Sequence, residues 1–308
     1  MKVLVTGGAG FIGSHTIEAL MAEGVRVEAL DNLSTGFAHN LPAGVPLIEA
    51  DVADERTTQI VARGRYEAVF HLAAQIDVRT SMNDPVFDAT TNVVGSIRVL
   101  EGCRIAGTKK FIFASTGGAC YGEQDYFPAD ENHPLRPISP YGAAKVSVET
   151  YLHVYTANYG MECFALRYAN VYGPRQNPHG EAGVVAIFLN RMLQGLPPRI
   201  NGDGLQTRDY VYVGDVARAN VLALTTLRRS GAYNVGTGKE HTVVDVFNGL
   251  NAFFDERFTP EFAPAKAGEQ RRSCVSSQKL LSETGFAPQT PLAEGLKLTA
   301  EWFKKHRC

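Results

Sequence analysis

The 308 residues carry 30 Lys and Arg against 32 Asp and Glu, a formal net charge of −2, and 44% of them are hydrophobic. This composition excludes a disordered chain, and the lack of a basic excess argues against a nucleic-acid partner. No apolar run is long enough to cross a membrane, and glycines from Gly7 onward argue against a secretory signal, so we expect no membrane partner.

In chain order, the first half alternates predicted strands with predicted helices. The strands are apolar runs without polar alternation, typical of a sheet buried on both faces, and they cover Lys2–Thr6, Val25–Leu30, Val45–Ala50, Ala68–Ala73, Lys110–Ser115 and Glu162–Tyr168. Helical patterns lie between them at Ser14–Glu23, Glu55–Arg63, Pro85–Ala106 and Pro140–Tyr159. This alternation predicts an α/β fold, a doubly wound parallel sheet of the Rossmann type over residues 1–170.

After Tyr168 the chain changes character, because Gly and Pro punctuate the segment from 172 to 180. Further helices are predicted at Gly183–Gln194, Val213–Leu227, Thr242–Phe254 and Leu292–His306, with short strands near Asp209–Val213 and Tyr233–Gly236. We therefore expect a smaller C-terminal lobe of mixed α/β structure over residues 171–308. The segment near 205–230 is a candidate for returning to the first lobe.

Three glycines, Gly7, Gly10 and Gly13, stand between the first predicted strand and the first predicted helix. In such a turn one glycine allows the tight bend, one lets the backbone approach a pyrophosphate, and one lets helix pack closely on strand. The start of the helix adds unpaired N–H groups and a positive dipole end. The spacing and its position therefore predict a dinucleotide-binding turn.

Asp31 ends the second predicted strand about 20 residues beyond this turn, where a ribose-binding acid is expected. A carboxylate accepts hydrogen bonds from both ribose hydroxyls but repels a 2′-phosphate, so we predict NAD rather than NADP as the cofactor. Asp51, at the end of the third predicted strand, could receive the adenine amino group. A solvated loop acid is the alternative interpretation of Asp51.

Tyr141 and Lys145 are four residues apart on a predicted helix, so they lie on one face of it. A nearby ammonium and the positive ring of bound NAD⁺ would favour the phenolate and lower the pKa of the tyrosine. The pair therefore predicts acid–base chemistry. Ser115 and Thr116 end the fifth predicted strand, where ligands bind in such folds, and either hydroxyl could bind the reacting group or merely cap the strand end.

With these residues in place, the chain resembles the extended short-chain dehydrogenase/reductase family and, within it, the UDP-glucose (UDP-galactose) 4-epimerases. The resemblance implies interconversion of UDP-glucose and UDP-galactose by transient oxidation at C4 with bound NAD. The segments that carry it, in order along almost the whole chain, are Thr6–His15, Asp31–Ser34, Asp51–Val52, His71–Ala74, Asn92, Ser115–Thr116, Tyr141–Lys145, Arg167–Pro174 and Arg208–Val211.

The resemblance also implies a set of site residues. Those implied for catalysis are Tyr141, Lys145, Thr116 and Ser115. Those implied for the cofactor are Gly7, Gly10, Phe11, Ile12, Gly13, Asp31, Asn32, Asp51, Val52, Leu72, Ala73, Ala74, Gln75, Asn92, Tyr141 and Lys145. Those implied for the UDP-sugar are Thr116, Tyr141, Asn170, Arg208, Lys266, Glu269 and Ser273.

Three positions depart from the usual pattern of the family. Ile76 stands where many epimerases have a lysine. The Arg-x-Gly-Asp clamp on the nucleotide becomes a segment from Lys266 to Glu269, and lysine cannot grip phosphate in the bidentate way of arginine. The gatekeeper over the sugar 2-substituent falls at Ser273, whose small side chain leaves room for an N-acetyl group. We therefore include UDP-GlcNAc and UDP-GalNAc among the expected substrates.

Two alternatives stay open. A UDP-glucuronate 4-epimerase or decarboxylase of the same family has a similar His71–Gln75 motif, and a non-catalytic NAD-sensing regulator would share the fold. A dehydratase is disfavoured, because Gly117 and Gly118 stand where it needs an acidic pair.

The remaining expectations concern partners and location. Family members pair through two helices, here Pro85–Ala106 and Pro140–Tyr159, so the resemblance implies a homodimer. The five cysteines form no CxxC pair and have no metal-ligand spacing. We therefore expect reduced thiols, no metal and a cytoplasmic location.

Overall fold

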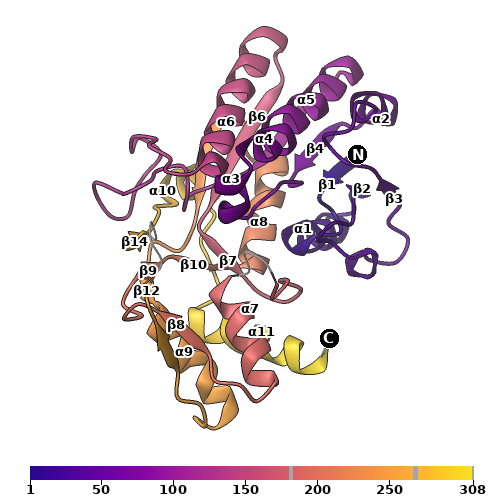
Figure 1. The fold of residues 1–308 in the computed structure, drawn as a ribbon. Coiled ribbons are helices and arrows are strands. Elements are labelled where there is room, and N and C mark those ends of the chain that lie inside the picture. The colour runs from indigo at the N-terminus through magenta and orange to yellow at the C-terminus, as the bar shows by residue number, and fades with distance from the viewer. Residues whose placement is uncertain (180–182, 266–269, 307–308) are drawn as a thin grey trace.

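The computed structural model describes residues 1–179, 183–265 and 270–306. Its upper part is built on a seven-stranded sheet in which every neighbouring pair of strands is parallel (Figure 1). The strands, in spatial order, are β3 (Leu47–Glu49), β2 (Arg26–Asp31), β1 (Lys2–Thr6), β4 (Ala68–His71), β5 (Lys110–Thr116), β6 (Glu162–Tyr168) and β11 (Gly231–Val235). The order reverses between β1 and β4, as in a doubly wound fold, so the predicted Rossmann-type sheet is confirmed.

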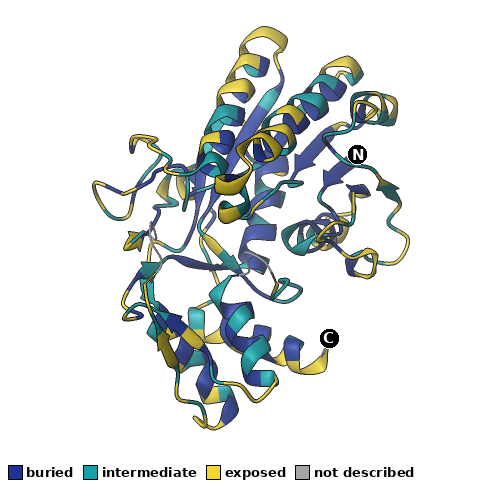
Figure 2. Ribbon diagram, in the orientation of Figure 1, coloured by how far each residue is buried: buried dark blue, intermediate teal, exposed yellow. Residues whose placement is uncertain are grey.

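Helices cover both faces of this sheet, because successive residues of a buried strand point to opposite sides. On one side, Val3 and Val5 of β1 share a core with Ile17, and the helices there are α1 (Phe11–Ala22) and α8 (Val213–Thr225). On the other side, Leu4 shares a core with Val148, and the helices there are α2 (Thr57–Gly64), α5 (Gly95–Ala106) and α6 (Pro140–Tyr159). Apart from the edge strand β3, the strands between these layers are buried along most of their length (Figure 2).

The lower part of the molecule has a core of its own, in which Phe188 and Phe247 are buried. Its helices are α7 (Val184–Leu193), α9 (Val243–Asn251), a single 3₁₀ turn η3 (Ala252–Phe254) and α11 (Leu292–Lys305). Its short strands pair as β7 (Asn170–Tyr172) with β10 (Tyr210–Tyr212), β8 (Arg199–Asn201) with β13 (Glu261–Ala263), and β9 (Thr207–Arg208) between β12 (His241–Thr242) and β14 (Arg272–Ser273).

The second half of the chain also contributes to the sheet. β11 forms its edge beside β6, and α10 (Gln278–Thr284) packs on β11. α8 lies in the segment that was a candidate for returning to the first lobe, and it packs on α1 and β5.

Some elements differ from the sequence-based prediction. The helix predicted over Pro85–Ala106 is divided into α4 (Pro85–Ala89), a π-helical turn η2 (Thr90–Val94) and α5. A short helix α3 (Val78–Asn83), capped by Asp77, precedes them, and a 3₁₀ turn η1 (Ala38–Asn40) follows β2; neither was predicted. Among the described residues, no helix combines the length and apolarity needed to span a bilayer.

The crossing of α2 and α5 supplies a test of the packing. A Cβ added to Gly102 would lie 2.6 Å from Val61 Cβ and 2.8 Å from the Thr58 carbonyl oxygen. Gly102→Ala should therefore destabilise the protein by about 1–3 kcal/mol, although alanine is the better helix former by about 1 kcal/mol. Urea unfolding measures the change. Val61→Ala removes Cγ1, which would lie 2.9 Å from the added Cβ, so the double variant should lose less stability than the two single losses added together. A stabilised Gly102→Ala variant would contradict the packing.

Candidate active site

The glycine turn lies at the carboxyl edge of the sheet, between β1 and α1. Gly7 has a φ of +69°, and a Cβ there would lie 2.6 Å from the backbone nitrogen of Ala73. A Cβ on Gly13 would collide with the carbonyl oxygen of Gly7. No side chain caps the start of α1, where Phe11 and Ile12 form the first turn, so its first N–H groups are available to an anion. The turn therefore fits a pyrophosphate.

Three polar residues meet at the ends of β2 and β3. Asp31 is buried, and its two carboxylate oxygens accept hydrogen bonds from the N–H groups of Ala9, at 3.0 Å, and Leu33, at 2.8 Å. Burial raises the pKa of Asp31, and these two N–H donors oppose the rise. Asn32 donates from its amide to Asp51 at 2.8 Å. The structure thus brings together the residues predicted for the adenosine end of the cofactor.

The loop after β4, which runs from Leu72 through Ala74, is half-buried and is fixed by Asn92 from the π-helical turn. Asn92 accepts a hydrogen bond from the N–H of Gln75 at 3.0 Å and donates to the carbonyl of the same residue at 2.9 Å. One oxygen of the buried Asp88 accepts from both side-chain amides. These contacts show how Gln75 and Asn92 are held, and it stays a prediction that they line a cofactor channel. The predicted role of Val52, which packs close to Gly95, also stays a prediction.

Tyr141 and Lys145 lie in the first turns of α6, which Ser139 caps by accepting from the N–H of Gly142 at 3.1 Å. The Lys145 side chain is buried and donates to the carbonyl of Ala114 at the end of β5, at 2.9 Å. Its Nζ lies 5.7 Å from the centre of the Tyr141 ring. Both residues therefore meet at the carboxyl edge of the sheet, as their spacing on one helical face predicts.

The two groups titrate in opposite directions from their usual values. Burial lowers the pKa of Lys145 to about 8, with Cys120, Asp88 and Glu149 opposing the shift. Desolvation raises the pKa of Tyr141 above its usual value, and Cys120 and Asp88 raise it further. Without the cofactor, the pKa of Tyr141 is therefore shifted upward by desolvation; its lowering by the ammonium and the positive ring of NAD⁺ together stays a prediction.

The two hydroxyl residues at the end of β5 have different surroundings. Thr116 is half-buried and accepts a hydrogen bond from the N–H of Ala119 at 3.2 Å, which leaves its own proton to donate. Ser115 is buried and donates to Glu149. Of the two, Thr116 is the hydroxyl placed to meet a ligand, since that of Ser115 is already engaged.

The residues predicted for the UDP-sugar come from the short strands of the lower part. Asn170 begins β7 and is exposed, and its side-chain oxygen and that of Thr116 flank the same glycine, Gly118. Arg208 of β9 is half-buried and stands opposite the buried Ser273 of β14 in the parallel register. Lys266 and Glu269 lie outside the described residues.

Charged and polar groups that were not among the predicted site residues lie behind them. His71 is buried between the hydroxyls of Thr6, at 2.7 Å, and Ser96, at 2.9 Å, and burial with the nearby Lys145 lowers its pKa to about 3. Glu149 and Arg167 form a buried ion pair. Glu149 stands one helical turn beyond Lys145, so the same spacing rule that linked Tyr141 to Lys145 could have found it.

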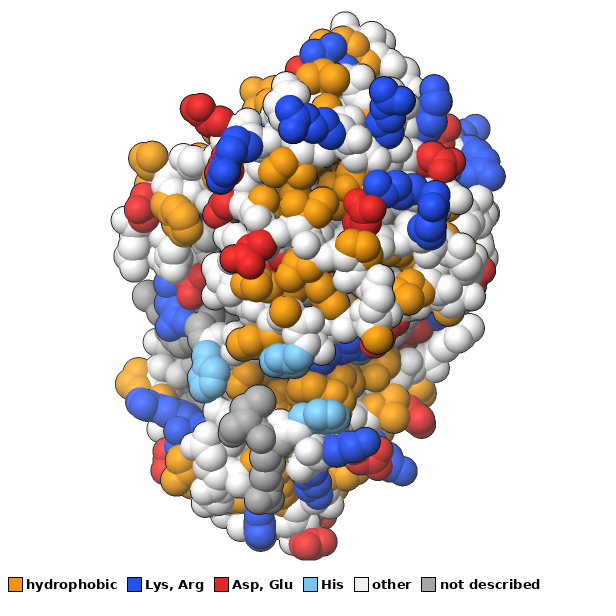
Figure 3. Space-filling view, turned by 90° about the vertical axis from the view of Figure 1, so that its right-hand side faces the viewer, with side chains coloured by type: hydrophobic (Ala, Val, Ile, Leu, Met, Phe, Trp, Pro, Cys, Tyr) orange, Lys and Arg blue, Asp and Glu red, His pale blue; other side chains and the backbone are white. Residues whose placement is uncertain are grey.

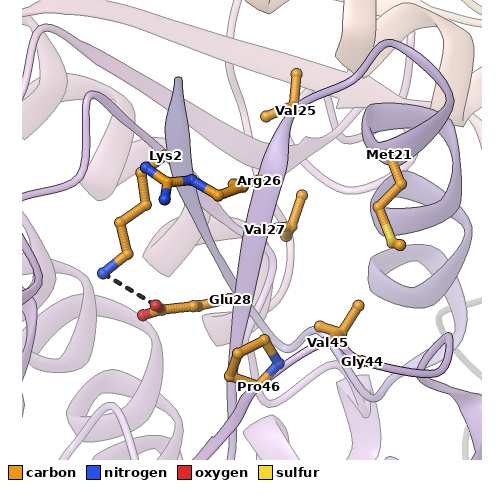
Figure 4. A pocket seen from close by; sticks show the side chains of 9 residues that line it. All are labelled: Lys2, Met21, Val25, Arg26, Val27, Glu28, Gly44, Val45 and Pro46. Atoms are coloured by element: carbon orange, nitrogen blue, oxygen red, sulfur yellow. Dashed lines mark ion pairs between the residues drawn. The ribbon is translucent and has the colours of Figure 1, made fainter.

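A separate hollow of about 300 Å³ lies at the opposite edge of the sheet (Figure 4). It is lined by the amino ends of β1 and β2, and its Lys2 is paired with Glu28 at 2.9 Å. Ligands of doubly wound sheets bind at the carboxyl ends of the strands, so this hollow is not the active site. Within the described ranges, no group of three His, Cys, Asp or Glu could hold a metal.

Comparisons with known proteins agree with this geometry. A UDP-glucose 4-epimerase of Mycolicibacterium smegmatis is 44% identical over 309 residues, 99% of both chains. The crystal structure of a UDP-glucose 4-epimerase from Thermotoga maritima with UDP-glucose has a TM-score of 0.96 at 48% identity, and that of a Thermus thermophilus UDP-glucose 4-epimerase in complex with NAD has 0.93 at 48%, each over 99% of both chains. The model of the NAD dependent epimerase/dehydratase family matches residues 3–236, and the chain belongs to this family.

Proposed function

We propose that this chain is an isomerase, a UDP-hexose 4-epimerase that interconverts UDP-glucose and UDP-galactose with NAD. The observation that carries the proposal is the meeting of Tyr141, Lys145 and Thr116 at the same edge of the sheet as the glycine turn. The similarity to UDP-glucose 4-epimerases over the full length of both chains supports it.

The cofactor site is proposed at that glycine turn. The turn would hold the pyrophosphate, Asp31 and Asn32 the adenosine ribose, and Asp51 and Val52 the adenine. Bound NAD supplies a hydride acceptor and donor for the sugar C4. The proposal divides the chain into two functional parts. Residues 1–170, together with α8 and β11, hold the cofactor, and the remaining residues of 171–308 hold the nucleotide sugar.

In the proposed reaction, Tyr141 accepts the proton of the sugar 4-hydroxyl and later returns it to the same oxygen. The Lys145 ammonium favours the phenolate form, and Thr116 donates a hydrogen bond to the reacting oxygen. Asn170 and Arg208 anchor the UDP diphosphate, so the hexose can be held loosely enough to present either face. Lys266, Glu269 and Ser273 are proposed to complete this side of the site.

The test is NMR of the products formed from UDP-glucose by the wild type and by Tyr141→Phe. We expect UDP-galactose from the wild type and a rate lower by about 10²–10⁴-fold in the variant, because the proton acceptor is lost. The variant should still bind NADH, which fluorescence checks. Incubations with UDP-GlcNAc and UDP-glucuronate test the other substrates. Conversion of UDP-glucuronate alone would favour the glucuronate enzymes, and conversion of no sugar would favour an NAD-sensing regulator.

Asp31 provides a test of cofactor choice. Its buried carboxylate would repel the extra phosphate of NADPH, so the wild type should bind NADPH at least about ten times more weakly than NADH. Asp31→Asn removes the charge and keeps one of the two oxygens, so it can accept from only one of the N–H groups of Ala9 and Leu33. The difference between NADH and NADPH should shrink, because the repulsion is lost. Fluorescence titration measures both. Equal affinities in the wild type would contradict the assignment.

We also propose a homodimer, formed through α4 and α6. These neighbouring helices expose Val86, Phe87, Tyr151, Val154 and Tyr159, with exposed fractions from 40% to 74%. Figure 3, which faces the right-hand side of Figure 1, shows hydrophobic side chains between charged ones in the upper part of the molecule. An apolar face of this kind marks an interface, and a second copy would bury it by two-fold symmetry.

Val154→Glu should weaken this self-association by at least about tenfold, because it buries a charge without a partner. Sedimentation would then show the monomer at concentrations where the wild type is a dimer. Leu298→Glu, on α11 in the lower part, is the control and should leave the dimer intact. A monomeric wild type would refute the proposed interface.

The proposed location is the cytoplasm. The four described cysteines are buried and unpaired. Burial raises the pKa of the Cys103 thiol, and the nearby Cys163 raises it further. A compartment that keeps thiols reduced suits them.

A further inference from the structure

A buried ion pair lies behind the proposed catalytic residues, and the proposed reaction makes no direct use of it. The guanidinium of Arg167 donates to both carboxylate oxygens of Glu149, with Nε to Oε1 at 3.0 Å. The two side chains are 5% and 10% exposed. Charges are rarely buried to this degree unless they are paired, and replacing such a pair by apolar groups often costs no stability. Stability alone therefore does not account for it.

The pair is built into the strands that end at the active site. Ser115 of β5 stands opposite Arg167 of β6 in the parallel register, so both side chains point to the face covered by α6. Glu149 reaches them from α6 and accepts the hydroxyl proton of Ser115 in a hydrogen bond. The third guanidinium nitrogen of Arg167, Nη1, donates to the hydroxyl of Tyr121 at 2.9 Å. The carboxylate is thus held by two partners, Ser115 and Arg167, and Arg167 is itself held by Tyr121.

This arrangement joins α6 to two consecutive residues of β5, directly before Thr116. Lys145 donates to the carbonyl of Ala114, Glu149 receives the hydroxyl of Ser115, and Thr116 is the next residue. Glu149 stands one turn after Lys145 on the same helix. A shift of α6 along β5 would have to break both contacts, so the distance from Thr116 to Lys145 is set by this pair of contacts.

We infer that Glu149, held by Arg167 and Ser115, is a positioning residue for Lys145 and Thr116, and that its charge helps to keep Lys145 protonated at working pH. The inference rests on the proposed function, because it requires Lys145 to act as an ammonium in the reaction.

Several groups face the Lys145 ammonium. Asp88 approaches from α4, the Cys120 thiol from the segment after β5, and Tyr141 and Glu149 from α6 itself. His71 of β4 is neutral, since burial and Lys145 lower its pKa to about 3. Burial lowers the pKa of Lys145 to about 8, against Cys120, Asp88 and Glu149, which favour the charged form. Asp88 is held by two amides, whereas Glu149 is held by a guanidinium.

Loss of the Glu149 charge should lower the pKa of Lys145. Glu149→Gln keeps the shape and removes the negative charge, and it leaves the Arg167 cation uncompensated. Both changes disfavour the ammonium, so the pKa of Lys145 should fall below about 8 and the proton should be lost at lower pH. In the profile of kcat against pH, the basic limb should therefore shift to lower pH by about 1 pH unit. A purely structural ion pair would lower the thermal midpoint and leave this limb in place.

The experiment measures kcat for UDP-glucose epimerisation as a function of pH, and the thermal midpoint of unfolding. It does so for the wild type, Glu149→Gln and Glu149→Gln/Arg167→Gln. The double variant removes both buried charges, so it should fold where the single variant fails. Its basic limb should still lie at lower pH than that of the wild type. Asp215→Asn is the matched control. It breaks another ion pair with a buried carboxylate, to Arg218 on α8 across the sheet, and should lower stability without moving the limb.

Ser115→Ala tests positioning separately from charge, because it removes only the hydroxyl bonded to Glu149. We expect a lower kcat with KM and the basic limb unchanged. An unchanged kcat in Ser115→Ala, or a limb that coincides with that of the wild type in every folded Glu149 variant, would overturn the inference. A wild type that does not epimerise UDP-glucose would instead overturn the proposed function.

Discussion

The parallel direction of β1, β4 and β5 is the constraint on which the site depends. Because these strands end at one edge, the glycine turn after β1, the loop after β4 and the hydroxyl of Thr116 after β5 are neighbours in space. The close approach of Gly7 to Ala73 is a direct result, since no side chain fits between those two turns. The helix α6 places its tyrosine at this edge through the contacts of Lys145 with Ala114 and of Glu149 with Ser115.

The site is also a place where polar groups are buried in an apolar interior. His71, Lys145, Glu149 and Arg167 all stand against the cores beneath the helices, and each is satisfied by a named partner. Burial shifts the pKa of both His71 and Lys145 downward, which leaves the imidazole neutral and the amine close to its titration point near pH 8. Burying polar groups in this setting costs free energy unless they are paired. This favours a single arrangement of the strands and α6, the one in which all of them are paired.

The features that follow from local chemistry could be predicted from the sequence. The glycine turn and the spacing of Tyr141 and Lys145 depend on neighbours along the chain, and the sheet follows from apolar runs. The π-helical turn around Asn92 and the pairing of Glu149 with Arg167 depend on contacts between distant segments, which periodicity does not report. The short strands β9, β12 and β14 were missed for the same reason: two-residue strands exist only through their partners.

The position of β11 has a consequence for how the protein is made. Residues 231–235 close the edge of the sheet beside β6, and Asn234 within them accepts the hydroxyl of Tyr121, which in turn receives Arg167. A growing chain that ends after β6 therefore exposes an unpaired strand edge, a hazard for aggregation, until residues 231–235 have left the ribosome. The hydroxyl of Tyr121, which receives Arg167, acquires its own acceptor only at that moment, so the first lobe completes its interior hydrogen bonds late in synthesis.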